Sequence, residues 1–127
     1  MSRILIVEDN LDLRTLLYDA LLDAELEVRA AADGAEALAI ADEWQPDAIV
    51  LDLMMPNMDG TAFLRERKAR PQLEHVPVLV LTAHPYHHRL LDGLDVNLVL
   101  RKPYDLNELL TAIEIMSAGE SGHEHAC

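Results

Sequence analysis

The chain of 127 residues has a single cysteine, Cys127, and it stands at the last position. One cysteine excludes an internal disulfide framework and any zinc or iron–sulfur site built from several thiolates. A long apolar run is also missing near the start of the sequence, where the apolar stretch after Arg3 ends at the acidic pair Glu8-Asp9. This stretch is too short for a signal-peptide core or a membrane span. We therefore expect a cytoplasmic protein that does not associate with membranes.

Basic residues are scarce, with 10 Lys plus Arg against 23 Asp plus Glu and a formal net charge of −13. Nucleic acids and anionic membranes are bound through positively charged surfaces, so direct binding of DNA or RNA is not expected. The short basic run Arg65, Arg67, Lys68 and Arg70 is interpreted as a solvated helix face. The totals leave open where the negative charge is concentrated.

Four apolar runs rich in Val, Ile and Leu predict strands that are buried on both faces. They cover residues 4–7, 48–51, 78–81 and 98–100. Residues 26–30 alternate only in part and predict a fifth strand, nearer the edge of the sheet. Half of the residues are hydrophobic, which suffices for one core in a domain of this length.

Apolar residues at helical spacing between these runs predict helices over residues 11–24, 34–43, 61–69 and 106–116. Asn10 and Asp105 are candidate N-caps, and Leu16, Leu17 and Leu21 belong to the predicted apolar face of the first helix. Residues 86–93 predict one more helix, short and poorly patterned. The alternation predicts an α/β fold with a doubly wound, five-stranded parallel sheet and helices on both faces. Residues 117–127 lose the apolar periodicity and are predicted to be a disordered tail after a domain of residues 1–116.

Polar residues stand at or just beyond the ends of four of the predicted strands. They are Glu8, Asp9, Asp52, Thr82 and Lys102. The carboxyl ends of parallel strands share one edge of the sheet, where the sites of open α/β folds lie, so these side chains are expected to converge. Neighbouring carboxylates repel one another unless a cation neutralises them, and a ligand set made only of oxygen favours Mg²⁺.

A phosphoryl group would complete this arrangement of charges. Lys102 supplies a positive charge for its oxygens and Thr82 a hydroxyl donor. An aspartate carboxylate can accept a phosphoryl group to form an acyl phosphate. Asp52 is the best placed of the carboxylates for that role.

The sequence carries four motifs at and near the predicted strand ends, namely Val-Glu-Asp-Asn at 7–10, Asp-Leu-Met-Met-Pro-Asn-Met-Asp-Gly at 52–60, Thr-Ala at 82–83 and Arg-Lys-Pro-Tyr at 101–104. Together and in this order they resemble the receiver domains of two-component response regulators, which include single-domain chemotaxis regulators. The resemblance covers roughly residues 3–116 and implies the flavodoxin-like strand order 2-1-3-4-5. It also implies a phosphoryl donor, namely a histidine kinase or a phosphotransfer protein.

The resemblance further implies a role for each matching residue. Asp52 corresponds to the phosphoacceptor, Asp9 to a direct Mg²⁺ ligand, Glu8 to a ligand acting through water, and the Met54 backbone carbonyl to a further ligand. Thr82 and Lys102 correspond to the residues that hold the phosphoryl oxygens, and the Lys102-Pro103 peptide is expected to be cis. The chain is then a phosphoacceptor that assists its own phosphorylation and dephosphorylation, and not an enzyme with an external substrate.

Two features depart from the family pattern. Val99 stands where the family carries an aromatic three residues before the lysine, and residues 84–97 leave little room for the family's fourth helix. Both lie on the usual output face, so we expect a partner-specific readout there. The fifth helix and residues 84–97 form the candidate surface for a homodimer.

Two other functions are weighed against phosphotransfer. A phosphorylation-independent interaction module, or pseudo-receiver, would keep the fold for docking alone. A phosphohydrolase of the haloacid-dehalogenase type is disfavoured, because Met54 stands where that pattern needs a second aspartate. The signal would pass to a downstream protein target or to a fused effector.

Overall fold

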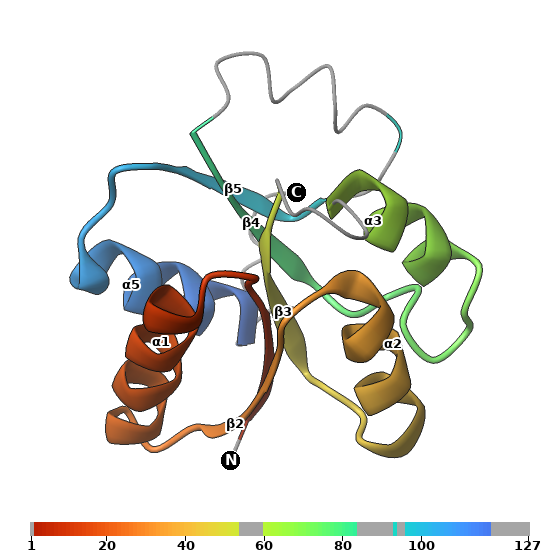
Figure 1. Ribbon diagram of the computed structural model, residues 1–127, viewed down its shortest axis with the longest axis horizontal. Helices are drawn as coiled ribbons and strands as arrows, with labels where there is room; N and C mark the ends of the chain where they lie inside the picture. Colours follow the sequence, from red (N-terminus) through yellow and green to blue (C-terminus); the bar gives the residue numbers. More distant parts are fainter. Residues whose placement is uncertain (1, 54–59, 84–92, 94–95, 118–127) are drawn as a thin grey trace.

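The computed structural model describes residues 2–53, 60–83, 93 and 96–117 of the protein. Over these residues strands and helices alternate along the chain (Figure 1). The elements are β1 (Arg3–Val7), α1 (Leu11–Asp23), β2 (Glu27–Ala31), α2 (Gly34–Glu43), β3 (Ala48–Asp52), α3 (Gly60–Lys68), β4 (Val78–Thr82), β5 (Leu98–Arg101) and α5 (Leu106–Ser117). No helix of the described residues is both long and apolar enough to cross a membrane.

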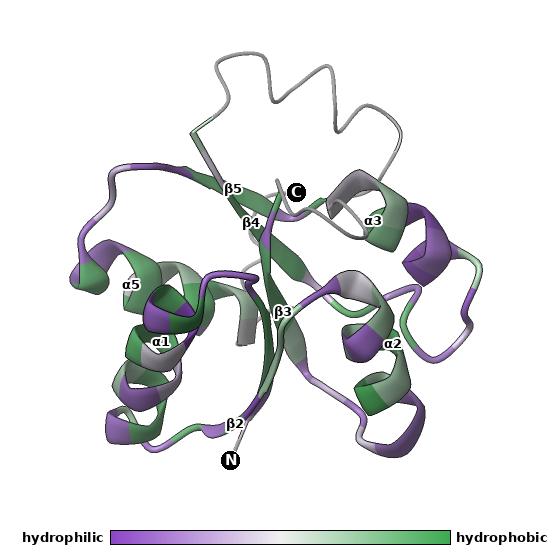
Figure 2. Cartoon of the chain, in the orientation of Figure 1, coloured by the Kyte–Doolittle hydropathy of each residue, from purple (hydrophilic) through white to green (hydrophobic). Residues whose placement is uncertain are grey.

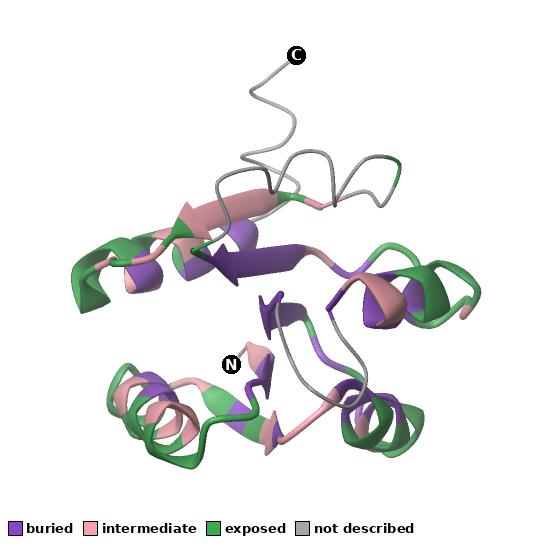
Figure 3. Cartoon of the chain, turned by 45° about the horizontal axis from the view of Figure 1, so that its top comes forward, coloured by how far each residue is buried: buried purple, intermediate pink, exposed green. Residues whose placement is uncertain are grey.

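The strands form one parallel sheet in the order β2-β1-β3-β4-β5. Helices α1 and α5 cover one face and α2 and α3 cover the other (Figures 1 and 3). The predicted fold class, strand order and placing of helices on both faces are therefore confirmed. The helix predicted over residues 86–93 falls outside the described residues, except for Gly93.

Successive side chains of the central strands enter two different cores, because strand side chains alternate between the faces of a sheet. Leu5 and Val7 of β1 pack into the core beneath α2 and α3, while Ile4 and Ile6 pack into the core beneath α1 and α5. The same division holds along β3 and β4, which are hydrophobic over most of their length (Figure 2). This explains why these strands are apolar at nearly every position.

Both predicted N-caps are present. The Asn10 side chain accepts a hydrogen bond from the Leu13 backbone N–H at 2.9 Å. At the start of α5, Asp105 Oδ1 accepts from the Glu108 N–H at 2.8 Å and Glu108 Oε1 accepts from the Asp105 N–H at 3.0 Å. This reciprocal pair is a capping box, which satisfies two donors at the helix start.

Two details of the sequence interpretation are wrong. Leu16 is 60% exposed, because the buried stripe of α1 is centred on Leu17 and Leu21, one turn apart, and Leu16 lies to one side of it. Arg67 is only 2% exposed and donates from Nη2 to the Val76 carbonyl at 2.7 Å. This hydrogen bond links α3 to the segment that precedes β4. Arg67 therefore does not belong to a solvated basic face.

Candidate functional site

The carboxyl ends of the strands bring the five predicted site residues to one edge of the sheet. Glu8 and Asp9 follow β1, Asp52 ends β3, Thr82 ends β4 and Lys102 follows β5. Carboxylate oxygens of Glu8, Asp9 and Asp52 lie within 4.8 Å of one another. Lys102 Nζ lies 3.5 Å from Asp52 Oδ1. The Met54 carbonyl lies outside the described residues.

Strand register explains why residues so far apart in the sequence meet. Asp52 pairs with Leu81, which places Thr82 one position beyond Asp52 on the neighbouring strand. The Lys102 N–H donates to the Thr82 carbonyl at 2.8 Å, which fixes the lysine beside β4. The Lys102-Pro103 peptide that follows is cis, as the family resemblance implies.

Glu8 is the most deeply buried carboxylate of this group, at 1% exposure. Its Oε2 accepts a hydrogen bond from the Asn10 N–H at 3.1 Å, whereas its Oε1 meets no hydrogen-bond donor in the described part of the chain. The pKa of Glu8 is raised to about 7, mainly by burial and also by the charge and closeness of Asp52, against the lowering effects of the Asn10 N–H and of Lys102. The buried oxygen therefore calls for a proton or a cation.

The donor set fits a small hard divalent cation. All the candidate side-chain ligands are carboxylate oxygens, which Mg²⁺ prefers. Asp9 is exposed and leaves the site accessible from solvent, while Glu8 and Asp52 form its buried wall. A cation here would remove the mutual repulsion of the carboxylates and satisfy Glu8 Oε1. The residues present thus suit Mg²⁺, with Lys102 as the nearby positive charge.

Gly60, the first residue of α3, packs against the backbone of Leu53, the residue after Asp52. Its N–H donates to the Leu53 carbonyl at 2.6 Å. A Cβ at this position would lie 2.6 Å from the Leu53 carbonyl oxygen and 2.7 Å from the Leu53 Cα. Only glycine allows this approach, so Gly60 brings the first turn of α3 directly onto the end of β3.

Two residues that the sequence analysis did not single out border the site. Arg14 donates from Nη1 to the backbone carbonyls of Glu8 and Asp9. The Tyr104 hydroxyl is buried without a hydrogen-bond partner among the described residues, and burial, followed by the charges of Glu8 and Asp52, raises the pKa of Tyr104. Tyr104 belongs to the motif at 101–104, but its position in the sequence does not predict that its hydroxyl is buried. The sequence around Arg14 likewise does not predict that its side chain turns back to the carbonyls of Glu8 and Asp9.

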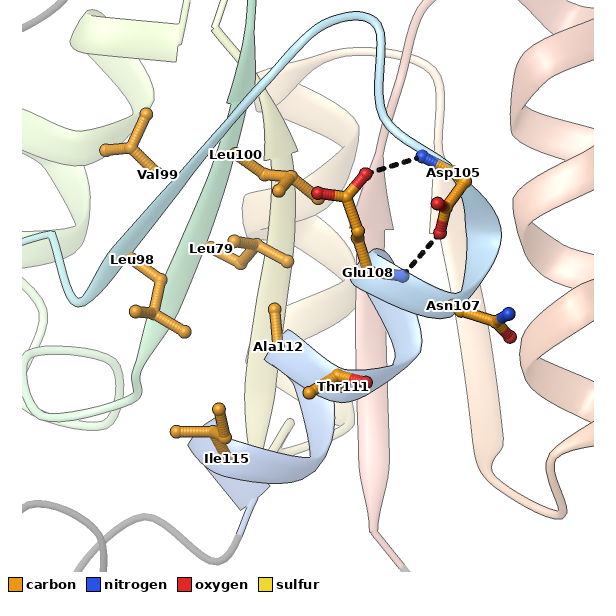
Figure 4. Close-up of a pocket in the computed structure, with 10 residues that line it drawn as sticks. All are labelled: Leu79, Leu98, Val99, Leu100, Asp105, Asn107, Glu108, Thr111, Ala112 and Ile115. Carbon is orange, nitrogen blue, oxygen red and sulfur yellow. Dashed lines mark hydrogen bonds between the residues drawn. The ribbon is translucent and has the colours of Figure 1, made fainter.

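A separate groove of about 480 Å³ lies between β5 and α5 (Figure 4). Apolar side chains such as Leu98, Leu100 and Ile115 line it, and the Asp105–Glu108 capping box stands at one end. None of the carboxylates at the sheet edge contributes to its lining. Val99, at the position of the family's aromatic, also borders the groove and is only partly buried.

Comparison with known proteins agrees with this geometry. The family model of the response regulator receiver domain matches residues 4–114. The chain is 40% identical over 108 residues to the response regulator PleD of Caulobacter vibrioides, which covers 83% of this chain and 24% of PleD. It is 36% identical over 109 residues to the sensor histidine kinase TmoS of Ectopseudomonas mendocina, which covers 84% of this chain and 11% of TmoS. The chain thus spans a quarter or less of these two curated relatives.

Solved structures show the same architecture. The chemotaxis protein CheY4 of Vibrio cholerae superposes with a TM-score of 0.85 at 33% identity, covering 90% of this chain and 97% of that one. The receiver domain of the sensor histidine kinase PA1611 from Pseudomonas aeruginosa superposes with a TM-score of 0.85 at 30% identity, covering 93% and 98%. The latter structure has a magnesium ion coordinated in its active-site cleft.

Proposed function

The chain belongs to the response regulator receiver domain family of two-component signalling, and on that premise we propose that it takes a phosphoryl group onto Asp52. The donor is the phosphohistidine of a histidine kinase or of a phosphotransfer protein. Glu8, Asp9 and Asp52 hold Mg²⁺, with the Met54 carbonyl as a further ligand. The observation that carries this proposal is the cluster of carboxylates within 4.8 Å, with Lys102 Nζ 3.5 Å from Asp52.

In the proposed step an Asp52 carboxylate oxygen attacks phosphorus. An acyl phosphate forms, the phosphorus–nitrogen bond of the donor breaks, and the imidazole leaves with the electron pair of that bond. Lys102 meets the phosphoryl oxygens with its ammonium group, and the Thr82 hydroxyl donates a hydrogen bond to one of them. Bound Mg²⁺ supplies positive charge for the carboxylates and the phosphoryl oxygens together. Hydrolysis of the acyl phosphate at the same site would return Asp52 to its starting state.

We propose that the phosphoryl group shifts a two-state equilibrium that involves the segments after β3 and β4 and the face from residue 84 to 104. Residues 54–59, 84–92, 94 and 95 of these segments lie outside the described part of the chain. In the family, an aromatic side chain turns inward when the threonine moves. Val99 stands at the position of that aromatic, so we expect no such coupled movement with Thr82. Recognition by a partner of this altered face is therefore the readout we propose. Three further expectations remain predictions: a domain of residues 1–116 with a disordered tail, a cytoplasmic location, and a homodimer through the fifth helix and residues 84–97. Of the predicted tail, residues 118–127 lie outside the described residues.

Phosphorylation by a small donor tests the proposal directly. Incubation with acetyl phosphate and Mg²⁺ should add one acid-labile phosphoryl group, detected by intact-protein mass spectrometry. Asp52→Asn should abolish the adduct, whereas Asp19→Asn, on the exposed side of α1, should leave it unchanged. Absence of an adduct with several donors, or its persistence in Asp52→Asn, would sink the proposal.

The pseudo-receiver alternative makes the opposite prediction for partner binding. A phosphorylation-independent module needs no phosphoacceptor, so its affinity for a partner would be the same in Asp52→Asn as in the wild type, with or without donor. Nothing in the described part of the chain favours this function over phosphotransfer.

A further inference from the structure

Arg14, the fourth residue of α1, reaches back over the start of its helix toward the turn that carries two of the carboxylates. Its Nη1 donates to the Glu8 carbonyl oxygen at 2.9 Å and to the Asp9 carbonyl oxygen at 3.3 Å. The helix macrodipole disfavours a cation near the N-terminus of a helix. Helix formation by itself therefore does not account for an arginine at this position.

Further hydrogen bonds hold the turn of residues 8–10 that Arg14 contacts. The Glu8 N–H donates to the Ala31 carbonyl at 3.0 Å, and the Asn10 N–H donates to Glu8 Oε2 at 3.1 Å. Asp9 lies between them and is exposed. The contact from Arg14 ties the Asp9 peptide to α1, while the carboxylates of Glu8 and Asp9 remain within 4.8 Å of the Asp52 carboxylate.

We propose that Arg14 is a positioning residue for the cation site. By holding the carbonyls of Glu8 and Asp9, it keeps both carboxylates beside Asp52 before the ion arrives, and the site needs little rearrangement on binding. This inference rests on the proposed Mg²⁺ site. Groups that hold metal ligands in place typically contribute about 10- to 100-fold in metal affinity.

A role of Arg14 through its charge and a role in positioning predict opposite changes in Mg²⁺ affinity when Arg14 is removed. If the guanidinium acted only through its charge, its removal would strengthen Mg²⁺ binding, because a repulsion between two cations disappears. If it positions the turn, its removal weakens binding. Arg14→Lys separates the two effects, because lysine keeps the charge but lacks the rigid guanidinium that places Nη1 between the two carbonyl oxygens.

The test is isothermal titration of the metal-free protein with MgCl₂. We expect Arg14→Lys to weaken Mg²⁺ binding about tenfold, and Arg14→Gln to weaken it as well. The matched control is Arg70→Lys, since Arg70 also makes a short contact, to Asp42 Oδ1 at 2.7 Å, but at another place in the fold. Its affinity should stay within about twofold of the wild type.

A second readout separates positioning from a general loss of stability. The rate of Asp52 phosphorylation by acetyl phosphate should be reduced in Arg14→Lys at low Mg²⁺ and restored to the wild-type rate at saturating Mg²⁺. A role confined to fold stability would lower the melting temperature but leave the Mg²⁺ dependence unchanged. Should Arg14→Lys fail to fold by circular dichroism, the titration of Arg14→Gln decides.

Specific results would overturn the inference. An Arg14→Lys affinity within twofold of the wild type, or an Arg14→Gln variant that binds Mg²⁺ more tightly, excludes a positioning role. If the wild type binds Mg²⁺ and is phosphorylated while Arg14→Lys behaves identically, only this inference fails. If the wild type binds no Mg²⁺ at millimolar concentrations, the proposed function fails together with it.

Discussion

Ionisation of Glu8 should make the metal-free protein less stable as the pH rises. The side chain is 1% exposed, and its pKa lies at about 7 against an ordinary value of 4.5. Folding therefore favours the protonated form, and the negative charge is a cost to the folded state. That cost is absent below pH 4.5, grows as the pH rises and is complete above pH 7.

The size of the effect follows from the pKa difference. Each unit corresponds to about 1.4 kcal/mol, so the ionised Glu8 lowers the free energy of unfolding by up to about 3 kcal/mol at pH 8. For a domain of this size that amounts to a shift of about 10 °C in the melting temperature. Glu8→Gln removes the charge while keeping the shape of the side chain. It should stabilise the metal-free protein by this amount at pH 8 and by nothing near pH 4.5.

Thermal unfolding in EDTA from pH 4.5 to pH 8 measures this difference. The control is Glu43→Gln at the exposed end of α2, which should follow the wild type at every pH. Saturating Mg²⁺ should shrink or reverse the advantage of Glu8→Gln, because ligand binding stabilises the wild type by about 2.7 kcal/mol at a hundred times its Kd. A Glu8→Gln protein that is less stable than the wild type at pH 8 in EDTA would refute the reasoning.

Three further substitutions test the local structure around the site and the helix ends. Gly60→Ala should destabilise the fold by about 1–3 kcal/mol in urea unfolding, because its Cβ would press on the Leu53 backbone; an unchanged midpoint would contradict the close contact. Glu25→Gly should raise stability by about 0.5–1 kcal/mol, since Glu25 has a φ of 66°, and a loss of stability would contradict this. Asp105→Ala should cost about 1 kcal/mol by removing the acceptor of the Glu108 N–H, with a fall in the melting temperature as the readout.

The fold could be predicted from the sequence because its signals are local and repeated. Strands buried on both faces leave uninterrupted apolar runs, and Asn10 and Asp105 mark helix starts by their own chemistry. The parallel arrangement then places Glu8, Asp52 and Lys102 at a shared edge, whatever the details of packing. Convergence of the site residues could thus be expected from the sequence.

The burial of some side chains and the pKa of Glu8 depend on contacts between distant segments, so the neighbouring sequence does not predict them. Arg67 looks like a surface cation in the sequence, but its guanidinium is buried against the Val76 carbonyl. Leu16 and Leu17 are equally apolar, and only the position of the sheet decides which of them is covered. The raised pKa of Glu8 likewise depends on burial and on Asp52, and therefore arises only when β1 and β3 have come together.

The most direct test of the central claim is the Mg²⁺ dependence of phosphorylation, located to a single residue. The protein is incubated with acetyl phosphate in MgCl₂ or in EDTA, and the phosphoryl group is located by mass spectrometry of peptides prepared at neutral pH. We expect rapid labelling of Asp52 in MgCl₂ and none within the same time in EDTA. Labelling at another residue, or labelling of Asp52 at the same rate in EDTA, would contradict it.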